Sequence, residues 1–561
     1  MKKPWLKYYE KGVPASLKYP DQPLNWFLEE SAKKHPDHAA IYYFDEKITF
    51  KELNTMAGCV SRALPDLGLE PGDRVAIMLP NCPQIVAAYY GVLKARGIVV
   101  QVNPLLSPPE AGYIIGDSGA KIMITLPRYE NVYAPLLEQG TICTVVLTDV
   151  GDYASPMYKM LIALDSFIHR VHKGKSKGPG IVQFDDILAA APDAAKTKHK
   201  GPSPEDTALI QYTGGTTGNP KGVILTHANL VANTLQCRAW FNEMKTGPGG
   251  DVIMGVTPFF HVYGMTVVMN LGIYTGCTMV LLPRFIVDNV VETIKKYKCT
   301  IFPGVELMYN ALNHSKKSAR GYLTSIRACI SGAGPLYQAV QEKFESLTGG
   351  RVVEGYGLTE ASPVTHCNPV FGERKIGSIG VPVSDTEAKI VDHVHGEKEL
   401  KTGEHGELIV RGPQVMKGYW NKPEDTSKAL RKGWLYTGDL AVMDQDGYFR
   451  ILERKKDMIK TRGENVYPRN IEEVLRKHPA VADAVVVGLP DDALGEKIKA
   501  YIIPCKGNRI NIEELDAYCR KFLAKFEIPQ EFEFRKSLPK NLIGKVLRRK
   551  LREEEAKRAK K

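Results

Sequence analysis

The segment Tyr212 to Val223 combines residue types that together suit phosphate binding. It carries three glycines, three threonines and one lysine: Gly214, Gly215, Gly218, Thr213, Thr216, Thr217 and Lys221. Glycines let backbone N–H groups converge on an anion without clashes from Cβ atoms, while the hydroxyls and the lysine add donors and positive charge. A plain hairpin loop rarely needs this set, so we predict a phosphate-binding loop between strands at 208–212 and 222–226.

The residues around Lys221 exclude one large class of nucleotide-binding proteins. A Walker loop requires Gly-Lys followed by Ser or Thr. Here Pro220 precedes the lysine and Gly222 follows it. P-loop NTPases are therefore set aside.

Two further motifs carry carboxylates whose chemistry suits a nucleotide. The first, Glu354-Gly-Tyr-Gly-Leu-Thr-Glu-Ala-Ser362, contains Glu360, and a hard carboxylate ligand suits Mg²⁺. The second, Gly433-Trp-Leu-Tyr-Thr-Gly-Asp-Leu440, places Asp439 after a predicted strand and tight turn. One carboxylate there can accept two hydrogen bonds.

Pro258-Phe-Phe-His-Val-Tyr-Gly264 and Ser331-Gly-Ala-Gly-Pro-Leu336 lie between these motifs and complete a familiar order. Nearly end to end, the chain resembles the adenylate-forming superfamily of acyl-CoA synthetases, peptide-synthetase adenylation domains and luciferases. The resemblance implies that ATP and a carboxylic acid form an acyl-adenylate, after which coenzyme A takes the acyl group. ATP, Mg²⁺ and coenzyme A are therefore the expected ligands beside the acid.

The resemblance assigns a role to each nucleotide motif. Tyr356 is expected to stack on adenine, and Thr359 to bind phosphate. Glu360 is expected to hold the magnesium ion. Asp439 and Arg454 are expected to bind the ribose. The other expected ATP-binding residues are Gly332, Ala333, Gly334, Glu354, Gly355 and Gly357, with Thr213, Gly214, Gly215, Thr216, Thr217, Gly218, Lys221 and Lys545 around the phosphates.

The resemblance also implies an acyl pocket and a catalytic lysine. The pocket is expected at His261, Tyr263, Gly264 and Gly332. Lys545 is expected to orient carboxylate and phosphate, with Lys540 secondary. The expected catalytic set is Lys545, Thr213, Glu360 and His261.

Transfer to coenzyme A is expected to involve a rotation between two domains. By resemblance, Lys456 is the hinge, and Lys460 and Gly463 lie along the route of coenzyme A. Arg462 departs from the small residue that is commoner in the family, and its role stays open.

The acid itself is the least determined part of the prediction. Gly215, where many relatives have Ser, together with 258–264 and 454–459, looks most like bacterial long-chain fatty acid–CoA ligases. A ligase for aryl or medium-chain acids would keep every nucleotide motif. A membrane-associated lipid-binding protein without catalysis is the alternative of another class, but the intact Glu360, Asp439 and Lys545 argue against it.

The elements that must position these residues predict an α/β fold. Short apolar runs such as 74–79, 98–102 and 121–126 alternate with helical stretches such as 83–96, and the pattern resumes from 252 to 330. We predict two doubly wound α/β lobes, with Met265 to Leu282 as a buried helix turning into a strand. A small β-barrel subdomain is expected at 377–447. The domains expected are 1–453 for acyl and ATP binding and 454–561 as a mobile α+β lid.

Composition fits an ordinary enzyme of the cytoplasm. Apolar residues make up 43% and charged residues 25% of the chain, and the opening segment has no apolar core of a secretory signal. The ten cysteines include no Cys-x-x-Cys pair, so disulfides and structural zinc are not expected. Nucleic-acid binding is not expected either, because no base-stacking motif accompanies the net charge of +12.

One insertion suggests contact with a membrane. Met157, Met160, Leu161, Leu164, Phe167, Ile168 and Val171 follow helical spacing, and Lys173, Lys175 and Lys177 come next. Such a basic amphipathic helix can rest at the inner face of a membrane. Packing on the protein itself or in a homodimer explains the stripe equally well.

Overall fold

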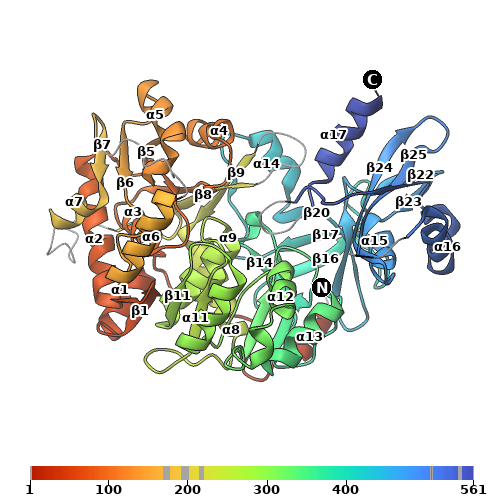
Figure 1. The fold of residues 1–561 in the computed structure, drawn as a ribbon, viewed down its shortest axis with the longest axis horizontal. Helices are drawn as coiled ribbons and strands as arrows, with labels where there is room; N and C mark the ends of the chain where they lie inside the picture. The colour runs from red at the N-terminus through yellow and green to blue at the C-terminus, as the bar shows by residue number, and fades with distance from the viewer. Residues whose placement is uncertain are drawn as a thin grey trace.

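The computed structural model describes residues 3–168, 177–190, 201–213, 220–505, 507, 510–540 and 546–559. The first lobe is built on an eight-stranded sheet (Figure 1). The strands are parallel from β8 to β7, whereas β9 and β18 run antiparallel at one edge. Their order is β18 (Gly418–Tyr419), β9 (Lys221–Thr226), β8 (Thr207–Thr213), β4 (Ile98–Gln101), β3 (Arg74–Met78), β5 (Ala120–Thr125), β6 (Thr144–Leu147) and β7 (Ile181–Gln183).

Both faces of this sheet are covered, because alternate residues of one strand enter different cores. Val75 and Ile77 of β3 pack with α2 (Phe50–Asp66) and α3 (Pro83–Lys94). Ala76 and Met78 share a second core with α4 (Pro108–Ser118) and α5 (Glu130–Glu138). The predicted doubly wound arrangement is confirmed.

The second lobe joins two four-stranded groups, and its sheet is mixed. Isolated bridges at Ile301 connect the two groups through β10 and β12. β1 and β2 come from the start of the chain and insert beside β11, through pairs such as Ile41 with Met279, which the sequence pattern did not predict. The groups are β10 (Val252–Gly255), β11 (Thr278–Leu281), β1 (Ala39–Tyr43) and β2 (Glu46–Thr49), and β12 (Ala328–Ser331), β13 (Arg351–Gly357), β14 (Val364–Cys367) and β15 (Val381–Pro382).

Helices again cover both faces of the second lobe. One core holds α11 (Val287–Tyr297), α12 (Glu306–Asn313) and α13 (Gln338–Thr348). On the other side lie α8 (His227–Trp240) and the run from Met265 to Thr275. That run is a π-helix at Met265–Asn270 followed by α10 (Leu271–Thr275) and then β11, so the prediction of a buried helix leading into a strand is confirmed.

A small antiparallel subdomain follows, as predicted. Its strands are β16 (Glu387–Val391), β17 (Gly406–Arg411), β20 (Trp434–Met443), β19 (Leu430–Arg431) and β21 (Phe449–Arg454). Asp439 does not follow the strand as predicted but lies inside β20. Gly438 has a φ of 70°, and the pairing of β20 shifts beside it, so the strand turns at this point without ending.

The C-terminal domain is α+β and lies beside the small subdomain in Figure 1. Its sheet contains β23 (Glu464–Val466), β22 (Ile459–Thr461), β25 (Gly495–Pro504), β24 (Val481–Asp491) and β26 (Glu531–Phe534). The helices are α15 (Pro468–Arg476), α16 (Ile512–Phe522) and α17 (Arg548–Ala559). The boundary at 453/454 stays a prediction.

The apolar insertion forms α6 (Pro156–Ile168) at the surface of the first lobe. Its Met157, Met160, Leu161 and Leu164 are all exposed, Met160 by 67%. The predicted residues from 169 to 176 lie outside the described part of the chain. Within that described part, no helix has both the length and the apolar character needed to cross a bilayer.

Candidate active site

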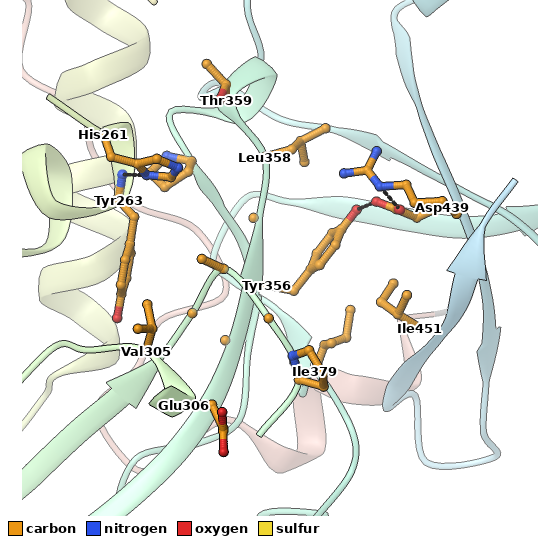
Figure 2. A pocket seen from close by; sticks show the side chains of 18 of the residues that line it. His261, Tyr263, Val305, Glu306, Tyr356, Leu358, Thr359, Ile379, Asp439 and Ile451 are labelled. Carbon is orange, nitrogen blue, oxygen red and sulfur yellow. Dashed lines mark hydrogen bonds and ion pairs between the residues drawn. The ribbon is translucent and has the colours of Figure 1, made fainter. Parts of the chain in front are cut away.

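A cavity of about 1750 Å³ lies where the two lobes, the small subdomain and the C-terminal domain meet. Figure 2 shows Tyr356 in its middle, with His261 and Tyr263 on one side and Asp439 on the other. Most of the predicted site residues that the structure describes line this cavity. Those residues are Thr213, Lys221, His261, Tyr263, Gly332, Ala333, Gly334, Glu354, Gly355, Tyr356, Gly357, Thr359, Glu360, Asp439, Arg454 and Lys456.

Tyr356, Asp439 and Arg454 form a connected polar group at one end of the cavity. Antiparallel pairing of β20 with β21 sets Asp439 directly opposite Arg454. The Arg454 Nε lies 2.8 Å from Asp439 Oδ1, and the Tyr356 hydroxyl donates to Asp439 Oδ2 at 2.5 Å. Asp439 raises the pKa of Arg454, and burial raises that of Tyr356. Arg454 therefore stays charged and the Tyr356 hydroxyl stays protonated at neutral pH, so both remain able to donate to Asp439.

The turn after β12 and the strand β13 form the adjoining wall. Gly332, Ala333 and Gly334 follow the end of β12. Ala333 adopts a φ of 65°, a conformation that L-residues rarely adopt. Small residues here expose backbone to the cavity and let a flat ring approach closely.

The opposite end of the cavity gathers the phosphate-side residues. Thr213 is the last residue of β8, and Lys221 is the first residue of β9. The two residues are paired directly across the antiparallel ladder. The Lys221 Nζ lies 2.7 Å from Asp425 and 5.2 Å from the centre of the Tyr419 ring. The predicted loop residues Gly214, Gly215, Thr216, Thr217 and Gly218, and the predicted catalytic Lys545, lie outside the described residues.

Glu360 is placed where a magnesium ligand is expected. It follows β13 in a short turn, lines the cavity, and accepts a hydrogen bond from the Tyr419 hydroxyl at 2.8 Å. Mg²⁺ is usually held by one or two carboxylates together with phosphate oxygens and water, rather than by a protein cage. The residues that the structure describes contain no cluster of three or more potential metal-binding side chains.

An apolar branch of the cavity leads into the large domain. His261 begins α9 (Val262–Gly264), and its Nδ1 accepts the Tyr263 N–H at 3.3 Å. The Tyr263 hydroxyl donates to the Ile330 carbonyl at 2.7 Å, which fixes the ring below Gly332. Gly264 does not line the cavity, because its Cβ position faces the Pro258 carbonyl at 2.3 Å. Gly264 therefore permits the close approach of the chain to Pro258 and does not form part of the pocket wall.

The sequence analysis missed the far wall of this branch. Cys237 and Trp240 end α8, and Val364 and Cys367 belong to β14; all four line the cavity. Trp240 donates its Nε1 hydrogen to the Asn368 carbonyl at 3.1 Å, so the indole is held in place. No motif marks these positions, and only the packing of α8 on β14 could identify them.

The C-terminal domain closes the cavity with basic side chains that the sequence analysis did not assign. Arg469, Arg476, Lys540 and Arg548 all line it. Lys456 lies at the junction, as predicted for a hinge, and burial lowers its pKa. The predicted coenzyme A residues do not line the cavity: Lys460 lies in β22, and Gly463 lies in the turn from β22 to β23.

Glu354 gives a prediction for the pH dependence of stability. Burial raises its pKa to about 7, although Arg469 opposes the shift. The unfolded chain releases this proton near the ordinary value, 4.5, and the folded chain only near 7. The free energy of unfolding should therefore fall by about 3 kcal/mol through this one group as the pH rises from 4.5 to about 7.

We expect Glu354→Gln, measured without ligands, to gain stability over the parent protein as pH rises from 4.5 to 7. Urea unfolding at pH 5 and pH 8 checks this. An unchanged difference between the two proteins at the two pH values would contradict it.

Comparison with known proteins gives a consistent result. Residues 28–420 match the AMP-binding enzyme family model, and residues 470–545 match that of the AMP-binding enzyme C-terminal domain. The chain is 45% identical to a long-chain-fatty-acid–CoA ligase of Bacillus subtilis, over 99% of this chain and 98% of that protein. It is 38% identical to the protein of the same name from Escherichia coli O157:H7, over the same shares.

Two solved structures of one protein inform the arrangement of the domains. ATP-bound MatB from Rhodopseudomonas palustris superposes with a TM-score of 0.83 at 29% identity, covering 95% of this chain and 99% of that one. The apo form of MatB has the same coverage and 30% identity but a TM-score of 0.74. This chain therefore superposes better on the ATP-bound structure than on the apo structure of that protein.

Proposed function

This chain belongs to the AMP-binding enzyme family, and from that premise we propose that it is an ATP-dependent long-chain fatty acid–CoA ligase. It joins a fatty acid to AMP, with release of pyrophosphate, and then transfers the acyl group to coenzyme A. One observation carries the proposal. A single cavity joins the Tyr356, Asp439 and Arg454 group, the Thr213 and Lys221 end, and an apolar branch. The full-length relatives named as long-chain ligases support the choice of acid.

In the first step, the fatty acid carboxylate attacks the α-phosphorus of ATP, and pyrophosphate leaves. Negative charge spreads over the phosphoryl oxygens, so fixed cations and donors lower the barrier. Asp439 and Arg454 hold the ribose, and Tyr356 presents its ring to adenine. Thr213 and Lys221 bind the leaving phosphates, and Lys545 orients carboxylate and phosphate. His261 stands where the acyl branch meets this end.

Glu360 would hold Mg²⁺ together with phosphate oxygens, and the cation would neutralise charge on them. Tyr419 fixes the Glu360 carboxylate through its hydroxyl hydrogen. Thr359, beside Glu360 on the same turn, adds a hydroxyl toward the phosphates.

In the second step, the thiol of coenzyme A attacks the acyl carbonyl, and AMP leaves. The C-terminal domain turns about Lys456, which withdraws Lys545 and brings the β22–β23 hairpin with Lys460 and Gly463 to the cavity. Neither Lys460 nor Gly463 lines the cavity in the present arrangement, which supports such a movement.

Thioester formation from defined acids tests the proposal. The purified protein is incubated with ATP, Mg²⁺, coenzyme A and an equimolar mixture of acetate, octanoate, oleate and benzoate. Mass spectrometry identifies the thioesters, and AMP is measured in parallel. Oleoyl-CoA with matching AMP is expected. Formation of octanoyl- or benzoyl-CoA instead would support the ligase reaction but contradict the proposed long-chain acid. If neither a thioester nor AMP forms, the result would favour a lipid-binding protein without catalysis.

We further propose that the protein works in the cytoplasm at the inner face of a membrane, from which it takes its acid. The exposed apolar side chains of α6 support this, because Met157, Met160, Leu161 and Leu164 present one apolar face. In sequence, the lysines at 173, 175 and 177 follow closely and suit an anionic lipid surface.

The double variant Met160→Glu/Leu164→Glu should bind vesicles containing anionic lipid about tenfold more weakly than the parent protein, because two apolar contacts are lost. Vesicle sedimentation measures this. Phe522→Glu is the matched control, since Phe522 is equally exposed but lies on α16. Unchanged vesicle binding would contradict the proposal. A change in apparent size on gel filtration instead would assign the α6 face to a homodimer.

A further inference from the structure

The carboxylate of Glu453 connects the two domains across the predicted hinge. It is the penultimate residue of β21, three residues before Lys456, and is only 5% exposed. Its Oε1 accepts a hydrogen bond from Arg548 Nη1 at 3.0 Å, and its Oε2 accepts the Arg469 N–H at 3.2 Å. Arg548 begins α17 and Arg469 lies in the first turn of α15. One side chain of the large domain therefore holds two elements of the C-terminal domain.

Arg548 is anchored on the C-terminal side independently of Glu453. Its Nη2 donates to Glu472 Oε1 at 2.7 Å, and the same Glu472 oxygen accepts the Val486 N–H at 2.9 Å. Both partners of that second contact belong to the C-terminal domain. A rotation about Lys456 can therefore preserve the contact of Arg548 with Glu472 while it breaks the contact with Glu453.

The contact with Glu453 is energetically significant because it is buried. A buried carboxylate that loses its cationic partner is left with an uncompensated charge. The pKa of Glu453 is raised, mainly by burial, with Arg548 acting in the opposite direction. The structure that contains this contact superposes better on the ATP-bound relative than on its apo form. In the sequence, Arg548 follows the proposed catalytic Lys545 by three residues.

We propose that Glu453 and Arg548 form a latch that holds the C-terminal domain in the arrangement for acyl-adenylate formation and opens before coenzyme A reacts. Glu453 is a positioning residue, because it acts through Arg548 and touches no reacting atom. The proposal rests on the proposed ligase function and adds how the two half-reactions are separated.

Glu453→Gln tests the latch, because it keeps the shape of the side chain and removes its charge. Single-turnover formation of oleoyl-AMP without coenzyme A should slow by about tenfold. Transfer of the oleoyl group from supplied oleoyl-AMP to coenzyme A should keep its rate or become faster. The latch would be overturned if both half-reactions slowed equally, or if neither half-reaction slowed. If Glu453 and Arg548 act through one contact, Glu453→Gln/Arg548→Gln should lose no more than Arg548→Gln alone.

Glu407→Gln is the matched control. Glu407 is also buried, and its Oε2 pairs with Lys455 at 2.8 Å, but both residues lie before Lys456. Its loss should leave the ratio of the two half-reaction rates unchanged. If the parent protein forms no acyl-AMP, the ligase function fails, and the latch is then judged by hydrogen exchange. Amides of 467–476 and 546–552 should exchange faster in Glu453→Gln than in Glu407→Gln, and equal exchange would overturn the latch.

Discussion

Lys545→Ala should abolish most acyl-adenylate formation and spare the second half-reaction. The loss of one donor aimed at developing charge typically costs about 100- to 1000-fold in rate. We expect a fall of that size in single-turnover oleoyl-AMP formation from ATP. Transfer from supplied oleoyl-AMP to coenzyme A should change little, because the lysine is withdrawn by then. Rapid-quench measurement of each half-reaction separates the two effects.

Lys540→Ala is the comparison for this experiment. Lys540 lies in the same C-terminal segment but is paired with Asp483 at 2.5 Å, within its own domain. Its loss should slow adenylate formation far less than the loss of Lys545. Similar slowing in the two variants, or equal slowing of both half-reactions in Lys545→Ala, would show that Lys545 lacks the proposed role.

Gly332→Val should remove activity toward long-chain acids selectively. A Cβ atom at Gly332 would lie 3.1 to 3.3 Å from three atoms of the Tyr263 ring. The ring cannot easily retreat, since its hydroxyl is bonded to the Ile330 and Gly304 carbonyls. The added side chain therefore narrows the entrance of the apolar branch. We expect kcat/KM for oleate to fall by about 100-fold, as overpacking of a well-filled site typically costs up to 3 kcal/mol.

Steady-state kinetics with oleate and butyrate checks this result. Butyrate needs little of the branch, so its kcat/KM should fall much less. Gly334→Ala is the matched control, because it lies in the same turn but its Cβ would meet no atom within 4 Å. An equal loss for both acids in Gly332→Val would mean that the substitution disturbs the nucleotide end instead of the branch.

Local features of the fold could be predicted from the sequence because their signals are local. The strands flanking the 213–221 loop carry their own periodicity, and the structure confirms them. The helix-to-strand run from Met265 is confirmed for the same reason. The prediction that Asp439 follows the end of a strand was wrong, because a bulge at Gly438 turns β20 without ending it.

Contacts between distant segments could not be predicted from periodicity. β1 enters the second sheet beside β11, although more than two hundred residues separate them in the chain. The meeting of Tyr356 with Asp439 was expected only through family resemblance, and their hydrogen bond depends on how β13 and β20 are packed. Glu453, Trp240 and Cys237 belong to no recognisable motif. Their roles follow from neighbours that only the folded chain supplies.

The walls of the apolar branch have a consequence for how such a protein can evolve. They come from α8, β14 and the turn after β12, all within the large domain, whereas the moving contacts lie beyond Lys456. Substitutions at Cys237, Trp240 or Val364 can therefore reshape the acid that is accepted without altering the groups that activate it. Proteins that descend from one ancestral gene can in this way come to accept different acids while they keep the same residues for activating them.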